Sequence, residues 1–547
     1  MMSAQEFDYI VIGGGSAGCV VAARLSQDKS VTVCLLEAGG PDSSVLIHMP
    51  AAVIAMVPTK ISNYAYQTVP QPGLNGRRGY QPRGKTLGGS SSINAMLYVR
   101  GNRWDYDHWA ALGNAGWSYE DVLPLFKRAE HNEVTGANAY HGANGPLNVT
   151  LPRHASPINQ MFIDAAAMNG IAPAVDYNGA NQAGAFMYQV TQKDGERCSA
   201  AKGYLTPNRS RPNLTVLTKT VAARVLLQGK RAVGVAFYQD NVLKEIRARR
   251  EVIVSSGAFG SPQLLMLSGI GPAAALQRTG VPVVHNLPGV GQNLQDHIDY
   301  VQLWRTTGKS KTVGISLGAT ATIIRSIFEW RTHRSGLLTS PYAEAGAFLC
   351  SAADVEVPDL QLVFVLAIAD DHARKLHLGH GISCHVDVLR PHSRGTVTLE
   401  SKDARAAPLI DPKFFSDERD LALLVKGARI QQRIIESSPF DAIRGEMLYP
   451  TNADDPVGLA TDIRNRADTQ YHPVGTCKMG PRADAQAVVD ARLRVHGIDG
   501  LRVIDASVMP TIIGGNTNAP TIMIAEKGAE MLQADARQSM HAEALSI

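Results

Sequence analysis

The first forty residues carry the pattern that most constrains the fold. Residues 7–12 form a short apolar run rich in β-branched residues, and the glycine-rich segment 13–18 follows directly, before small and apolar residues at helical spacing. The glycines therefore fall on a strand-to-helix turn. Gly13 permits the tight turn, Gly15 lets a pyrophosphate approach the backbone, and Gly18 lets helix and strand pack closely. This arrangement predicts a clamp for a dinucleotide.

An acidic residue completes the pattern. The apolar segment 31–36 ends at Glu37, about 20 residues beyond the glycines, where a carboxylate can accept hydrogen bonds from the adenosine ribose and disfavours a 2′-phosphate. Glycine loops also serve simple turns, but here strand, helix, second strand and acid occur in register. We therefore expect a dinucleotide site that also includes Ser16, Ala17 and Ala38.

Length and composition limit the alternatives. The chain has 547 residues, more than the roughly 250–300 at which one hydrophobic core stops growing, so we expect two domains. Its formal net charge of +4 comes without a basic block, so nucleic acid is not an expected partner. The six cysteines are scattered and no His-Glu-x-x-His occurs, which favours free thiols in a reducing compartment and no metal.

The sequence also bears on location. The N-terminus lacks a basic region followed by an apolar one, which argues against export. The longest weakly polar stretches, 313–324 and 360–369, are shorter than the roughly 20 apolar residues of a spanning helix. We expect a cytoplasmic protein and leave peripheral contact with the inner membrane open. The polar tail 533–547 is expected to be frayed surface rather than an anchor.

Periodicity predicts the remaining elements. The proline-rich segment 38–90 is expected to be a long loop that covers the cofactor. Helices are expected at 105–133, 157–168, 261–268, 421–435 and 457–466. Strands are expected at 186–192, 251–258, 360–366, 381–389 and 396–399, with a small antiparallel insertion at 214–217, 222–227 and 233–238. The alternating segments beyond residue 299 indicate a separate antiparallel sheet, which we interpret as the substrate domain.

A second glycine- and serine-rich element occupies residues 83–94. Its serines could cap a helix whose N-terminus faces the cofactor. A flexible linker is the alternative, but three serines within apolar flanks and two basic residues upstream favour a cofactor-facing turn. We expect contacts to the cofactor from Gly89, Ser90, Asn94 and Ala95.

Two polar groups stand out near the C-terminus. His472 precedes a proline, which makes the backbone extended and presents the ring from a rigid turn. A buried strand at 501–507 is followed by residues 514–521, whose glycines, amides and helix N-terminus form a second dipolar end that can face a flavin ring. A lone histidine is more often structural, but its occurrence with Asn516 in a dinucleotide-binding chain favours a catalytic base.

On these motifs the whole chain resembles the glucose-methanol-choline (GMC) family of FAD-dependent oxidoreductases. Residues 84–94 resemble the family's first signature and 257–271 its second. His472 falls where the family has its catalytic histidine, and Asn516 where it has a second histidine or asparagine. The branch it resembles is the bacterial alcohol and choline dehydrogenases, especially the membrane-associated enzymes that oxidise aliphatic alkanols. Ile93 stands where some choline-oxidising members link flavin to a histidine, which implies noncovalent FAD.

The resemblance implies an α/β fold with a Rossmann-like FAD-binding domain assembled from discontinuous segments, plus a substrate domain with an antiparallel sheet and helices. The expected FAD-binding segments are 1–155, 212–298 and 467–547, and the expected substrate-domain segments are 156–211 and 299–466. It also implies that Val221 contacts adenine through its backbone and that Asp505 and Ala506 lie near the flavin or ribityl chain. Thr517 and Pro520 would place the final helix. Tyr471 is expected in the substrate pocket or, equally, in the core.

The implied reaction is oxidation of a primary alcohol to an aldehyde. The hydride leaves for the flavin N5, His472 takes the hydroxyl proton, Asn516 orients the oxygen, and a quinone-type acceptor or O₂ takes the electrons. A hydroxynitrile lyase with a structural flavin is a rival. An NAD-dependent enzyme that also held flavin would need a second clamp, and the sequence contains only one. Choline is less expected because quaternary ammonium groups favour aromatic cages with a carboxylate, and aromatic residues make up only 6% of the chain.

Overall fold

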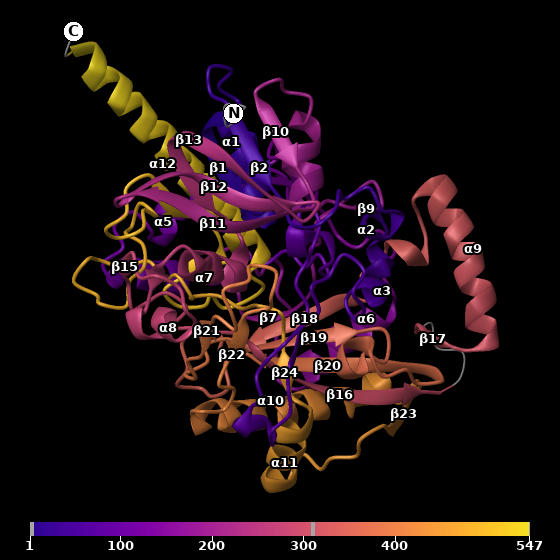
Figure 1. The fold of residues 1–547 in the computed structure, drawn as a ribbon. Coiled ribbons are helices and arrows are strands. Elements are labelled where there is room, and N and C mark those ends of the chain that lie inside the picture. Colours follow the sequence, from indigo (N-terminus) through magenta and orange to yellow (C-terminus); the bar gives the residue numbers. More distant parts are fainter. Residues whose placement is uncertain (1–4, 308–311, 546–547) are drawn as a thin grey trace.

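The computed structural model describes residues 5–307 and 312–545, and two large sheets organise this part of the chain (Figure 1). The first has the order β10-β2-β1-β13-β12-β11, with β25 paired to β13. Its strands are β1 (Glu6–Ile12), β2 (Val33–Leu36), β10 (Leu214–Leu217), β11 (Thr220–Gln228), β12 (Arg231–Gln239), β13 (Val242–Val254) and β25 (Leu501–Val503). Because three distant segments supply these strands, the predicted discontinuous Rossmann-like fold is confirmed.

The centre of this sheet is parallel: β1 pairs with β2 and β13, β2 with β10, and β13 with β25. Parallel strands covered on both faces are continuously apolar, and from Phe7 to Ile12 β1 is buried. The prediction that 214–217 belongs to an antiparallel insertion is wrong, because β10 extends the parallel part beyond β2. Only β11, β12 and the paired part of β13 form an antiparallel meander.

Two helices join the ends of the chain on this sheet. α1 (Ser16–Leu25) packs against α12 (Asn518–Leu545), and Arg24 forms a 2.8 Å ion pair with the buried Glu526. The prediction that the tail is frayed is wrong for residues 533–545, because α12 continues to Leu545. Residues 533–545 contain good helix formers and no glycine or proline, and Asp535 forms ion pairs with Arg494 and Arg502.

The second sheet is antiparallel and has the order β23-β16-β20-β19-β18-β7, with β17 on β20 and β24 on β16. Its strands are β7 (Gly184–Met187), β16 (Ile298–Thr306), β17 (Gly314–Ile315), β18 (Ala343–Leu349), β19 (Leu360–Val365), β20 (Gly379–Val388), β23 (Arg444–Met447) and β24 (Asp468–Thr469). Helices α6 (Ile158–Met168) and α10 (Glu418–Ile435) pack on it, with α11 (Pro456–Arg466) beside α10.

Alternation along β19 separates a core face from a site face, because successive side chains of a strand point to opposite sides. Leu360, Leu362 and Phe364 belong to the core beneath the helices. Val363 and Val365 instead line a cavity on the opposite face. The second sheet therefore forms one wall of that cavity.

Two further element predictions are wrong. The helix expected at 105–133 is two helices, α4 (Arg103–Ala111) and α5 (Tyr119–Ala129), because Gly113 and Gly116 adopt positive φ and Ser118 starts α5 with a capping box. The strand expected at 396–399 lies outside the large sheet. It is β21 (Thr396–Thr398), which pairs only with β22 (Leu409–Asp411) among the described strands.

The remaining elements connect these layers. The other helices are α2 (Val45–His48), α3 (Val53–Met56), α7 (Gly257–Leu267), α8 (Ala273–Arg278) and α9 (Leu317–His333). The other strands are β3 (Tyr66–Gln67), β4 (Tyr80–Gln81), β5 (Glu130–Asn132), β6 (Leu147–Val149), β8 (Gln192–Lys193), β9 (Glu196–Arg197), β14 (Ile270–Gly271) and β15 (His285–Asn286). Across residues 5–307 and 312–545, the length and apolarity needed to cross a membrane do not occur together in any helix.

Candidate active site

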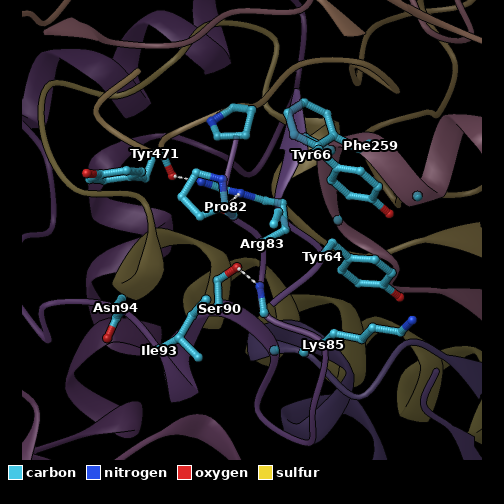
Figure 2. A pocket seen from close by; sticks show the side chains of 18 of the residues that line it. Tyr64, Tyr66, Pro82, Arg83, Lys85, Ser90, Ile93, Asn94, Phe259 and Tyr471 are labelled. Atoms are coloured by element: carbon cyan, nitrogen blue, oxygen red, sulfur yellow. Dashed lines mark hydrogen bonds between the residues drawn. The ribbon is translucent and has the colours of Figure 1, made fainter. Parts of the chain in front are cut away.

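A cavity of about 1450 Å³ lies between the first sheet and the second. Ligand pockets for small molecules usually measure about 300–1,000 Å³, so this one has room for a large cofactor together with a substrate. Figure 2 shows its interior, with Ser90, Ile93 and Asn94 on one side, Tyr64 and Tyr66 on another, and Arg83 between them.

The glycine turn after β1 leaves its backbone open toward this cavity. Gly13 has φ +100°, and a Cβ there would lie 2.4 Å from the Ser255 carbonyl oxygen. A Cβ on Gly18 would lie 1.8 Å from the Gly13 carbonyl oxygen, so that position serves the helix–strand packing. Gly15 differs, because its Cβ would meet only Gly89 Cα at 3.9 Å. Gly15 therefore presents bare backbone to whatever binds in the cavity.

Glu37 is fixed at the end of β2. Its Oε2 accepts a 2.8 Å hydrogen bond from the Gly14 N–H, and its Oε1 accepts a 2.7 Å bond from the Gly39 N–H. Burial raises the pKa of this carboxyl to about 7, although the two amides oppose the shift. The side chain also lines the cavity, where a ligand with hydroxyl donors would favour its ionised form.

Two helix N-termini meet on this wall. Ser16, the first residue of α1, donates a 2.8 Å hydrogen bond to Asn518 Oδ1 at the start of α12. Both residues line the cavity, as do Ala17 and Thr517. Since each helix N-terminus carries unsatisfied N–H groups and partial positive charge, the pair forms a site suited to a diphosphate.

His472 lies across the cavity in a hydrogen-bonded chain of buried groups. His297 Nε2 is 3.1 Å from the Leu389 carbonyl oxygen, and His297 Nδ1 is 3.0 Å from His472 Nδ1. A carbonyl only accepts, so Nε2 of His297 carries its proton and Nδ1 of neutral His297 is an acceptor. His472 must therefore donate from Nδ1, which leaves the lone pair on its Nε2.

Asn516 contacts that Nε2. Its Nδ2 lies 3.1 Å from His472 Nε2, and its Oδ1 accepts a 3.0 Å bond from Gln361 Nε2. Gln361 thus fixes which end of the Asn516 amide points at the histidine. One N–H of the amide faces His472, and the second remains for an oxygen bound in the cavity.

Burial keeps the histidine neutral. It lowers the pKa of His472 well below the usual range, and the nearby His297 and Arg83 lower it further. The same cause lowers the pKa of His297 to about 3. Asp296 holds the turn in place, since its Oδ1 accepts a 2.9 Å bond from the His472 backbone N–H. The site therefore presents a neutral, oriented base.

Comparison with known proteins shows the family to which this chain belongs. The N- and C-terminal models of the GMC oxidoreductase family match residues 7–299 and 391–525. The chain belongs to the GMC oxidoreductase family. It is 43% identical over 531 residues to "Alcohol dehydrogenase [acceptor]" of Pseudomonas putida, covering 96% of this chain and 95% of that protein. It is 42% identical over 543 residues to "Oxygen-dependent choline dehydrogenase" of Pseudomonas fluorescens, covering 97% and 94%.

A solved structure agrees with these relatives. The FAD-dependent oxidoreductase from Chaetomium thermophilum matches with a TM-score of 0.88 at 27% identity, covering 97% of this chain and 100% of that one. GMC oxidoreductases bind FAD, and this chain is an FAD-dependent oxidoreductase. The residues present fit the cofactor, because the open backbone at Gly15, the two helix N-termini and Glu37 offer groups for a diphosphate and a ribose.

The first GMC signature packs against the glycine turn. The Gly88 N–H donates a 2.7 Å bond to the Gly14 carbonyl, and a Cβ on Gly89 would lie 2.7 Å from Gly15 Cα. The expected helix cap is absent here. Gly89–Ser92 is a single 3₁₀ turn whose N-cap, Gly88, makes no side-chain cap bond.

The structure gathers the predicted site residues around one cavity, with one exception. Those that line it are Gly13, Gly15, Ser16, Ala17, Glu37, Ala38, Gly89, Ser90, Asn94, Ala95, Val221, Tyr471, His472, Asp505, Ala506, Asn516 and Thr517. Gly18 does not line it and has the packing position described above. Tyr471 reaches the cavity while its hydroxyl lies 2.7 Å from His372 Nδ1. Within the described residues no cluster of three or more potential ligands could hold a metal ion.

Three residues near the site are missing from the sequence-based prediction. His297 and Gln361 are brought to the site by the pairing of β16 and β19 with β20, and local periodicity cannot show which strands pair. Arg197 is buried, and no ion pair with a carboxylate forms at it within the described ranges. Its Nη1 donates to both the backbone oxygen and the Oδ1 of Asn94, and burial lowers its pKa to about 9.

Proposed function

We propose that this GMC oxidoreductase oxidises a primary alcohol to an aldehyde. The observation that supports this most directly is the lone pair of His472 Nε2, which lies 3.1 Å from Asn516 Nδ2 at the cavity wall. An alcohol hydroxyl bound there would replace the Asn516 N–H as the donor to His472 Nε2, and the alcohol oxygen would accept from the Asn516 amide. Bound FAD supplies a two-electron acceptor for the hydride that leaves the carbinol carbon.

His472 then holds the hydroxyl proton at Nε2. Its Nδ1–H already donates to His297, so the ring keeps one orientation before and after proton transfer. Because burial disfavours the imidazolium, the proton is readily released afterwards. General-base assistance of this type contributes about 10²–10⁴ in rate.

The cavity wall supports a neutral, apolar substrate. The part of the wall next to the second sheet is lined by Tyr342, Val363, Val365 and Ile368. The carboxylate of Asp299 lies behind His385, with 2.8 Å between Asp299 Oδ2 and His385 Nδ1. A quaternary ammonium group would have to displace this histidine, so we propose an alkanol as substrate and keep choline as the second candidate because of the choline dehydrogenase relatives.

The electron acceptor is the other half of the proposal. We propose that a quinone-type molecule or O₂ takes the electrons. We propose further that the protein is cytoplasmic and contacts the inner membrane peripherally, and that its FAD is not covalently attached. Ile93 lies in the cavity wall directly before Asn94, and its side chain offers no nucleophile for attachment to flavin. Denaturation should therefore release all of the flavin into the supernatant.

Anaerobic mixing with an alkanol tests the reaction. The oxidised flavin absorbance should bleach with 1-butanol or 1-octanol and return when a quinone or O₂ is added. A flavin that stays oxidised with alkanols and choline, while a cyanohydrin is cleaved, would instead identify a lyase with a structural cofactor.

A further inference from the structure

Helix α9 exposes apolar side chains on its outer side. Ser326 and Trp330 face inward, and Trp330 packs in a cluster with Ala51 and Tyr342. Opposite them, Ile324 is 55% exposed and Phe328 is 70% exposed. Figure 1 shows α9 standing at the edge of the molecule.

The exposed surface continues into the neighbouring segments. Ile315 in β17 bridges to Leu378, which is 76% exposed, and Leu376 beside it is 77% exposed. We call these side chains together the α9 surface: Ile315, Ile323, Ile324, Ile327, Phe328, Leu376 and Leu378. Single exposed apolar residues are ordinary, but a grouped set marks a contact surface.

Basic residues are interspersed with the apolar ones. Arg325 and Arg331 are exposed on α9, and the exposed Lys375 precedes Leu376, whereas Arg374 forms an ion pair with Asp371. Bulky apolar side chains with lysine and arginine among them are typical of surfaces that bind the headgroup region of anionic lipid. A protein partner would have to combine apolar and acidic groups over the same area.

Helix α9 adjoins the active-site cavity through its inward side. Trp330 of α9 belongs to the same cluster as Val53, Tyr342 and Val365, which all line the cavity. Ile54 lines the cavity and is also exposed to solvent. Ala373, on the other flank, lines it directly before Arg374. The helix and the segment that carry the exposed apolar residues therefore both lie beside the cavity wall.

We propose that the α9 surface docks on an anionic lipid bilayer. The cavity then opens toward the acyl chains, from which apolar alkanols and a lipid-soluble quinone can enter without crossing water. This inference rests on the proposed function only for the identity of the molecules that enter the cavity. The docking itself depends on the apolar and basic side chains described above.

Vesicle flotation of the full-length, FAD-loaded protein tests the docking. The protein should float with phosphatidylcholine–phosphatidylglycerol vesicles and much less with pure phosphatidylcholine. The double variant I324S/F328S should bind at least about tenfold more weakly, because two bulky apolar side chains no longer enter the bilayer. R325Q/R331Q should weaken binding to anionic vesicles by about thirtyfold, since each basic residue near such a surface contributes about 1 kcal/mol.

A matched control separates surface from composition. Val175 and Val457 are 104% and 75% exposed and lie outside the α9 surface, so V175S/V457S should float like the unmodified protein. Equal loss in this control, or no flotation of the unmodified protein, would overturn the proposal. The proposal would also be overturned if light scattering showed a dimer that I324S/F328S dissociates, with no binding to lipid. The α9 surface would then join two copies of the chain.

Flotation does not depend on the reaction. If no alcohol bleaches the flavin, the proposed function fails while the vesicle result still stands. If bleaching by 1-butanol is normal in I324S/F328S but flotation is unaffected, the docking proposal alone fails.

Discussion

At the residue scale, the proposed reaction depends on the tautomer of His472, which its hydrogen bond to His297 fixes. His297 receives the Nδ1–H of His472 because its own Nε2 is committed to Leu389. His297→Ala should therefore keep FAD but slow anaerobic flavin reduction by about 10–100-fold, the loss seen when a metal-binding histidine loses the hydrogen-bond partner that orients it. His297→Asn should recover part of the rate, because an amide oxygen can accept the same proton. Equal rates in His297→Ala and the unmodified protein would remove His297 from this role.

Glu37 gives a second prediction at this scale. Its pKa is raised to about 7 by burial, and ribose hydroxyl donors prefer the ionised form. The affinity for FAD should therefore rise as pH increases through about 7 and level off above it. Glu37→Gln should bind FAD more weakly with a flat pH dependence between pH 6 and 8. Calorimetric titration of the apoprotein measures both, and a flat profile with Glu37 intact would contradict the prediction.

At the element scale, we propose that the glycine turn and helix α1 bind the FAD diphosphate. Gly15→Val should abolish FAD binding, because its side chain would project toward Gly89 and the space left for the diphosphate. Gly280→Ala is a suitable control, since this glycine has positive φ but no atom within 4 Å of an added Cβ. The flavin absorbance per protein after purification measures the effect. A yellow Gly15→Val protein would show that the diphosphate lies elsewhere.

The elements also show what a sequence reveals. The turn after β1 could be predicted because Gly13, Gly15, Gly18 and Glu37 act within one βαβ unit. Predictions failed where distant contacts decide: Asp535 stabilises the end of α12 through Arg502, and Gln361 orients Asn516 across the second sheet. His472 could be found from its proline and its resemblance, but the partner that fixes its tautomer is 175 residues away.

At the scale of the whole molecule, the glycine turn belongs to the first sheet, whereas the groups that orient His472 come from around the second sheet. His472 lies in the C-terminal part of the chain. Its partners come from the second sheet or its flanks: His297, Leu389 and, through Asn516, Gln361. Loosening this contact should affect chemistry before cofactor retention. Asp296→Asn, which weakens the anchor of the His472 backbone, should lower the rate of flavin reduction more than FAD affinity. Equal losses in both would instead indicate general unfolding.

The most direct test of the central claim is stopped-flow reduction of the bound flavin by a primary alkanol without oxygen. The account predicts that the unmodified protein is bleached, and that His472→Ala remains yellow with normal FAD content and is reduced about 10²–10⁴-fold more slowly. Near-normal reduction in His472→Ala, or no reduction of the unmodified protein by any alkanol, would contradict it.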